Sequence, residues 1–319
     1  MLGNIHILGP QMPNPNVGDA LAKFCPTGNV AVISAGWRYD EGEIQALQNH
    51  IKRNVFHIPL YDWFDQLGSV EPELSGLHKK RQKYILATKK AYHIQLQSSL
   101  DSWMQIRDLH RKYPDTYDFE EKEACKYVQN VDARCIQRLF EIRRDFSSIM
   151  QPWLHESAQP LYEEIANKLA HSSALLIAGG HVAVLRNRLV FFGLEELLQD
   201  FLQDGKQIFA WSAGAMCLTD RIVLYHDDPP WGKGYAEILD SGLGILPNTV
   251  FLPHASSRLN LSDPDRIERF ARRFAPNVCA CLENGAHLLF TPDGVEDLSA
   301  KRSAFQLSVD GTKLALENV

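Results

Sequence analysis

The chain lacks the features that would place it in a membrane or an oxidising compartment. None of its apolar runs approaches the 18 or more residues that span a bilayer. The N-terminus, MLGNIHILGPQMPNPNVGD, has no basic segment ahead of a long apolar core, so we do not expect a signal peptide. The six cysteines are scattered without a C-x-x-C pair. We therefore expect reduced thiols in a cytoplasmic protein, with no metal and no cofactor.

An excess of positive charge is also missing. The net charge is -6 over 319 residues, of which 45% are hydrophobic, as in an ordinary globular protein. Because phosphate binding needs a cationic face, this balance argues against nucleic acid as the main partner. We expect neither nucleic acid nor a membrane as a partner, and a homodimer stays open as the oligomeric state.

Glycine and strand-like runs almost disappear between residues 74 and 170. Apolar residues there recur at roughly helical spacing, with lysines and arginines between them, in segments 75–113, 119–150 and 158–172. We interpret 74–170 as a helical insertion or cap packed on a core formed by 1–73 and 171–319. We interpret its lysines as a solvent-exposed helix face, with a binding surface as the alternative.

The two flanking regions alternate between strand and helix patterns. Before the insertion, 29–36 and 54–63 resemble buried strands and 40–53 a helix, which together form a βαβ beginning. After it, strand patterns recur at 173–181, 208–211, 221–227, 249–255, 279–284 and 286–294, with helices at 184–207 and 263–277. The pattern predicts an α/β fold with a mostly parallel sheet flanked by helices.

Ser212 stands where a strand gives way to a helix, in the segment AWSAGA (210–215). This segment is similar to the G-x-S-x-G turn, in which small neighbours let a nucleophilic serine sit on a sharp bend. The alternative is a structural turn in which the serine caps the helix. A serine nucleophile also needs a base, so a histidine must reach it.

Other polar or flexible positions also end predicted strands. His254 ends the strand 249–255, Gly179 and Gly180 end the strand 173–181, and His226 follows 221–225. Because the active sites of such sheets lie at the carboxyl ends of the strands, we expect Ser212, the two glycines and His254 to meet at one edge of the sheet.

The segments LLIAGGH, FAWSAGAM, YHDDPPWG and GLGILPNTVFLPHASSR resemble, in order and spacing, the aspartyl dipeptidase and cyanophycinase family of serine peptidases. The resemblance covers residues 173–260. It implies a class I glutamine amidotransferase-like fold, which is flavodoxin-like, with serine in place of cysteine as the nucleophile. The helical segment 74–170 is much longer than the family's usual connection.

The resemblance implies a catalytic triad. Ser212 matches the nucleophile, His254 the general base and Asp227 the acid that orients the histidine. Asp228 is the near alternative for the acid, and Glu283 is a more distant one.

The resemblance also assigns residues to binding. Gly180 and Ala213 match the oxyanion hole, and Arg258 resembles an arginine that holds a substrate carboxylate. An ion pair at the surface is the alternative for Arg258. His181 stands where the family usually has asparagine or aspartate, which places it on the pocket wall.

These assignments predict a serine hydrolase that cleaves an amide bond in small peptides through an acyl-enzyme, next to an acidic residue. We expect the helical insertion to narrow the entrance. A non-catalytic scaffold that binds a small molecule or a protein is the alternative. A cysteine glutaminase is weaker, because Cys217 should face away from the pocket.

Overall fold

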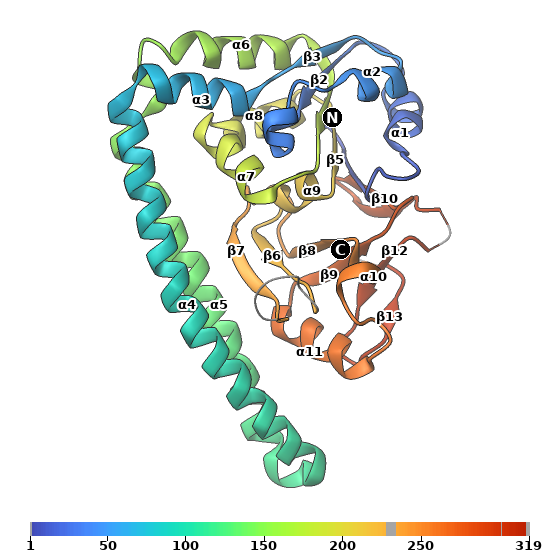
Figure 1. Ribbon diagram of the computed structural model, residues 1–319. Helices are drawn as coiled ribbons and strands as arrows, with labels where there is room; N and C mark the ends of the chain where they lie inside the picture. Colours follow the sequence, from blue (N-terminus) through green and yellow to red (C-terminus); the bar gives the residue numbers. More distant parts are fainter. Residues whose placement is uncertain (1, 228–233, 301, 317–319) are drawn as a thin grey trace.

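The computed structural model describes residues 2–227, 234–300 and 302–316. Its centre is a seven-stranded sheet with the strand order β11-β10-β1-β5-β4-β2-β3 (Figure 1). Parallel pairing joins the strands β1 (Ile5–Leu8), β5 (Gln207–Trp211), β4 (Ser172–Ile177), β2 (Asn29–Ile33) and β3 (Val55–His57). The hairpin of β10 (His287–Thr291) and β11 (Gly294–Asp297) pairs antiparallel to β1. The predicted α/β fold with a mostly parallel sheet is confirmed.

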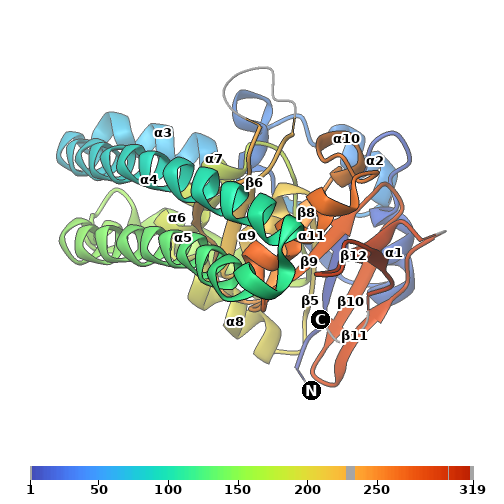
Figure 2. The ribbon, with the colours of Figure 1, turned by 90° about the horizontal axis from the view of Figure 1, so that it is seen from below.

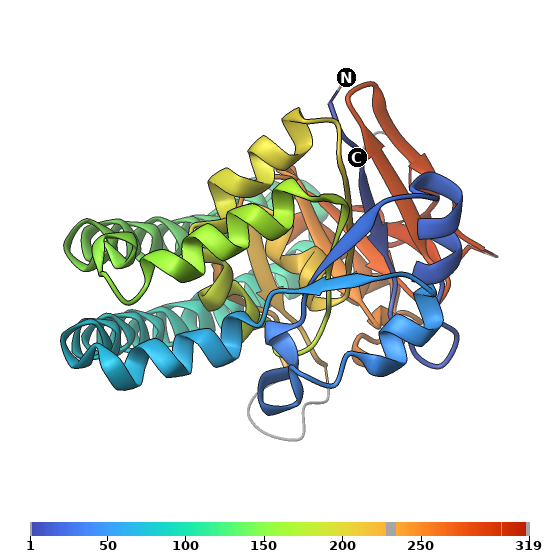
Figure 3. The same ribbon diagram turned by 90° about the horizontal axis from the view of Figure 1, so that it is seen from above.

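Helices cover both faces of this sheet because successive residues of its buried strands point to opposite sides. Val30 and Val32 belong to the cluster that packs under α1 (Val17–Phe24) and α2 (Gln45–Ile51). Ala31 and Ile33 belong to the larger cluster under α7 (Val182–Phe191) and α8 (Leu194–Gln203). Figure 3 shows α1 and α2 on the side of the sheet opposite to α7 and α8. Sequence patterning predicted one helix over 184–207, but Gly193, at φ 66°, divides it into two.

Two smaller sheets lie beyond the carboxyl ends of the central strands. One has the order β13 (Lys313–Leu314), β12 (Ala304–Leu307), β9 (Val278–Leu282) and β8 (Thr249–Pro253), with β8 and β9 parallel. The other is the antiparallel pair β6 (Arg221–Leu224) and β7 (Glu237–Ser241). The expectation of a single sheet edge is wrong in one respect, because His254 follows β8 and so belongs to the second sheet.

The segment rich in lysine and arginine forms a long helical hairpin. α3 (Leu60–Val70) leads into α4 (Pro72–Lys112), and α5 (Pro114–Met150) returns beside it before the short helix η2 (Pro152–Leu154) and α6 (Gln159–Ala170). Pro114 occupies the first turn of α5, where its missing N–H costs nothing. Figure 2 shows α4 and α5 running side by side along the flank of the molecule. Within the described residues, no helix combines the length and apolarity needed to cross a bilayer.

Buried ion pairs join this hairpin to the core. Arg107 of α4 donates to Asp265 and Glu268 of α11 (Pro264–Phe274), with its Nη2 2.7 Å from Asp265 Oδ1. Arg273 of α11 donates in turn to Asp132 of α5, at 2.8 and 2.9 Å. The hairpin is therefore anchored by charged side chains as well as by apolar packing.

Candidate active site

Ser212 lies on a strained turn between β5 and α9 (Ala213–Leu218). Its backbone has φ 49° and ψ -117°, a region that residues with a side chain rarely occupy. The turn needs small neighbours, since a Cβ on Gly214 would overlap the Ile177 carbonyl. The Ser212 hydroxyl makes no capping hydrogen bond to α9, so the helix-cap interpretation has no support. Strain of this kind gathers at functional sites.

A cavity of about 790 Å³ opens over Ser212. That volume is within the usual range for small-molecule pockets. Its wall brings together the loops after β4, β5 and β8 with the segment around α1 and α2. The lining residues are Pro10, Gln11, Met12, Pro15, Val17, Trp37, Ala46, Leu47, His50, Gly179, Gly180, His181, Val182, Ala183, Trp211, Ser212, Ala213, Met216, Leu224, Leu239, Pro253, His254 and Arg258. None of them lies between 74 and 170, so the expectation that the insertion narrows this cavity is wrong for the described residues.

His254 shares the cavity with Ser212. It precedes the short helix α10 (Ala255–Arg258), and its own φ of 60° lies in the left-handed region. Burial lowers the pKa of the ring below its ordinary value of 6.5, and the positive charge of Arg258 adds to that decrease. The ring is therefore neutral at pH 7 and able to accept a proton. Within the described residues it makes no hydrogen bond to Ser212, as is common before a substrate binds.

Glu283 is the carboxylate whose charge shifts the pKa of His254. The parallel register of β8 and β9 pairs Pro253 with Leu282, so the next residues, His254 and Glu283, leave the two strands side by side. The Glu283 charge raises the pKa of His254, opposing the decrease due to burial and Arg258. One of its oxygens accepts from the Ser256 N–H at 2.7 Å, which fixes the carboxylate beside the start of α10.

Asp227 is held by other partners. Its carboxylate accepts from Arg266 Nε and from the Asn260 N–H, both at 2.7 Å, and its own N–H donates to the Arg258 carbonyl. It borders a smaller cavity of about 320 Å³ between α4 and α11 and does not line the one that holds His254. Asp228, the near alternative, lies outside the described residues.

The two expected oxyanion donors are also brought to the cavity. Ala213 is the first residue of α9, so its N–H has no acceptor within the helix. Gly180, at φ 120°, follows Gly179, where an added Cβ would come within 2.9 Å of Ser212 Cβ. Neither the Ala213 nor the Gly180 N–H donates to an acceptor among the described residues. Both donors are free to bind an oxygen next to the serine.

Arg258 is the only charged residue in the described wall of the cavity. Its guanidinium lies 5.6 Å from the centre of the Tyr225 ring and forms no ion pair with a described carboxylate. The interpretation of Arg258 as part of an ion pair therefore has no support among these residues. His181 caps α7 by accepting from the Val184 N–H at 3.3 Å through Nδ1, so in the neutral ring Nε2 carries the proton. His226 does not line the cavity.

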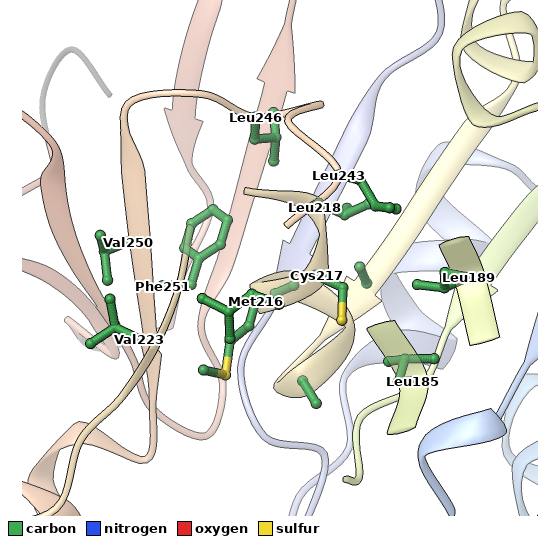
Figure 4. Packing of buried hydrophobic residues seen from close by; sticks show 14 of the residues in the cluster. Leu185, Leu189, Met216, Cys217, Leu218, Val223, Leu243, Leu246, Val250 and Phe251 are labelled. Atoms are coloured by element: carbon green, nitrogen blue, oxygen red, sulfur yellow. The ribbon is translucent and has the colours of Figure 1, made fainter. Parts of the chain in front are cut away.

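Sequence reasoning missed the apolar half of the cavity. Trp37 lies in the 3₁₀ helix η1 (Ala35–Asp40) and Leu47 in α2, and both face the site together with Val17 and Met12. The apolar character of these residues was the only feature that the sequence offered, and it does not distinguish the wall of a pocket from the core. Cys217 packs instead against Leu185 and Leu189 of α7, away from the cavity (Figure 4). Burial raises the pKa of its thiol to about 12, which excludes it as the nucleophile.

Comparison with known proteins gives one family match. The model of peptidase family S51 matches residues 146–298, which include Ser212 and His254. Among solved structures, the chain is similar to one described as a peptidase E protein of Listeria monocytogenes EGD-e, with TM-score 0.47 and 10% identity over 94% of this chain and 100% of that one. A peptidase from an acI-B1 Actinobacterium gives TM-score 0.47 and 11% identity over 99% and 98%. Likenesses of this size carry no functional argument, and no curated protein matches.

The family match covers β4, β5 and β8, and with them the three loops that carry Gly180, Ser212 and His254. It begins near the end of the helical hairpin and leaves most of that hairpin outside. The family resemblance seen in the sequence is confirmed. Residues 146–298 match the model of peptidase family S51, and the chain is a serine-type peptidase.

Proposed function

We propose that the protein cleaves an amide bond in short peptides with Ser212 as the nucleophile and His254 as its general base. Ser212 Oγ attacks the carbonyl carbon while neutral His254 takes the hydroxyl proton. The N–H groups of Ala213 and Gly180 stabilise the oxyanion, and His254 then returns the proton to the leaving amine. Water releases the acyl group by the same steps. The hydrogen bond between the Ser212 and His254 side chains forms when the substrate binds.

We further propose that Glu283 orients His254. Its position at the end of β9, beside the end of β8, supports this role, as does its effect on the pKa of His254. Asp227 is the residue matched by sequence resemblance, and its assignment stays a prediction. Its hydrogen bonds to Arg266 and Asn260 suit it instead to holding the chain that follows α10.

The cavity supports a substrate with one carboxylate and one apolar side chain. Arg258 supplies a guanidinium without a described carboxylate partner, which suits an acidic residue or a terminal carboxylate. Trp37 and Leu47 supply the apolar side. No described lining residue carries a carboxylate that would repel an anion. The cytoplasmic location and the oligomeric state stay predictions from the sequence.

The observation that carries this proposal is the free Ser212 hydroxyl, on a strained turn, in one cavity with a neutral histidine and two free N–H donors. A fluorophosphonate probe tests it. The probe should label the wild-type protein and the Ser256→Ala variant, but not Ser212→Ala. Hydrolysis of a dipeptide library should fall by about three orders of magnitude or more in Ser212→Ala. A wild-type protein that forms no Ser212-dependent adduct would support the binding scaffold instead.

A further inference from the structure

Three arginines are buried where the helical hairpin packs on the core. They are Arg81 of α4, Arg143 of α5 and Arg186 of α7, with 1%, 7% and 4% of their surface exposed. They surround Asp240 of β7, which is itself buried. This arginine cluster lies apart from the catalytic cavity, since none of its members lines that cavity. The cleavage mechanism proposed above uses none of its members.

The hydrogen bonds of the arginine cluster are incomplete. Arg143 binds Asp240 through Nε, at 3.0 Å, and through Nη2. Arg186 donates to the Ser241 carbonyl at 2.8 Å and to its hydroxyl at 2.9 Å. Among the described residues, Arg81 donates only to Asn187, at 3.3 Å. One buried nitrogen of each arginine has no described acceptor: Arg81 Nε, Arg143 Nη1 and Arg186 Nη1.

The charges of the arginine cluster do not balance either. Three guanidinium groups face one carboxylate, which leaves two positive charges without a described partner. Glu195 acts on Arg186 only at longer range and makes no described ion pair with it. Burial, together with repulsion from the neighbouring arginines, lowers the pKa of Arg81 to about 9 and that of Arg186 to about 10. Buried charge of one sign is costly unless an opposite charge compensates it.

We propose that the arginine cluster binds a small inorganic anion of the halide class, with chloride as the physiological ligand. An anion would accept from the free N–H groups and also offset the positive charge. A buried water would satisfy the donors but leave the charge. Because all three side chains are buried, a small monatomic anion is favoured over phosphate or sulfate. The anion would join α4, α5, α7 and β7 at the root of the hairpin.

Crystals of the wild-type protein grown or soaked in sodium bromide test the proposal directly. An anomalous difference peak within about 3.5 Å of the guanidinium nitrogens of Arg81, Arg143 and Arg186 is expected. A well-ordered cluster that shows only a water, or no density, would overturn it. Because this experiment uses the unmodified chain, it does not depend on whether a variant folds.

Thermal unfolding in matched salts provides the second test. Sodium chloride should raise the Tm of the wild-type protein above its value in sodium gluconate of equal ionic strength, by roughly 2–5 °C. Arg81→Met should lose this difference, while Arg144→Met, at an exposed arginine of α5, should keep it. A chloride effect equal in Arg81→Met and in the wild type would contradict the proposal. An Arg81-dependent rise with sulfate but not with chloride would contradict the halide class.

Discussion

The catalytic cavity and the interface between the helical hairpin and the core use charge in opposite ways. The described cavity wall has a single charged residue, Arg258, and no described carboxylate pairs with it. The interface buries many charged groups, and most are paired, as in Arg273 with Asp132 or Arg107 with Asp265. A free charge in a cavity is available for a ligand, whereas a paired one is already satisfied.

The two regions also differ in how their geometry is stabilised. In the cavity, Ser212 and His254 both have positive φ, and the cost of these conformations is borne by the packed strands on either side. At the interface the helices are regular. Their positions are fixed by hydrogen bonds between side chains that are far apart in the sequence. A substitution in the cavity should therefore change the reaction with little effect on folding. A substitution at the interface should do the reverse.

The largest expected effect tests which carboxylate orients His254 in the cavity. Glu283→Gln should lower kcat/KM by about two to four orders of magnitude, because an amide cannot stabilise the charged histidine in the transition state. Asp227→Asn should leave kcat within several-fold of the wild type, because its partners are Arg266 and Asn260. Steady-state hydrolysis of the best dipeptide, with circular dichroism to confirm folding, measures both. The opposite ranking would restore Asp227 as the orienting acid.

The next effect is on stability and belongs to the interface. Asp132→Ala leaves Arg273 buried without its carboxylate, and it also removes the acceptor of the Tyr92 hydroxyl. The free energy of unfolding should fall by about 3–5 kcal/mol. Asp118→Ala is the matched control on the same helix: its pair with Lys122 is exposed, so the free energy of unfolding should stay close to that of the wild type.

Urea unfolding followed by fluorescence measures both variants of the interface. In the absence of urea, and at a temperature at which Asp132→Ala is folded, the kcat of this variant should stay near that of the wild type. A loss of activity without a loss of stability would show that the hairpin shapes the active site. The separation of the two regions would then be wrong.

The central sheet and the catalytic loops could be predicted from the sequence because their signals are local. Apolar runs mark the buried strands, and the small residues around Ser212 mark the turn. Gly205 follows α8 with φ 76°, and a glycine just after a helical pattern is a local sign that the helix ends. Strand partners are not local, and so the sequence did not show that His254 and Glu283 belong to a second sheet.

The interface between the hairpin and the core shows more clearly what the sequence does not predict. Arg107 and Arg273 stand in helical segments with many charged residues, a pattern typical of a solvent-exposed face, yet both arginines are buried. Their partners, Asp265 and Asp132, lie far away in the chain, so the residues adjacent in sequence do not indicate the pairing. Likewise Trp37 lines the cavity because the fold brings η1 beside the loop after β4, where the His181 N–H donates to the Gly36 carbonyl at 2.7 Å.

The smallest expected effect is a shift in pH dependence, confined to the cavity. His254 must be neutral to accept the Ser212 proton, so activity falls as pH decreases through its pKa. Burial and Arg258 lower that pKa, so the acid limb of kcat/KM should lie below pH 6.5. Removing the positive charge with Arg258→Met should move the limb to higher pH, whereas Arg258→Lys should largely keep it in place.

Glu283→Gln should move the same limb to lower pH, because the Glu283 charge raises the pKa of His254. Asp118→Ala, on the exposed face of the hairpin, should leave it unchanged, since the charge of Asp118 does not contribute to the His254 shift. The position of the limb is independent of how much each variant lowers the maximum rate, so binding defects do not obscure it. If Arg258→Met and Glu283→Gln shifted the limb in the same direction, His254 would not be the group that titrates, and the general base would have to be sought elsewhere in the cavity.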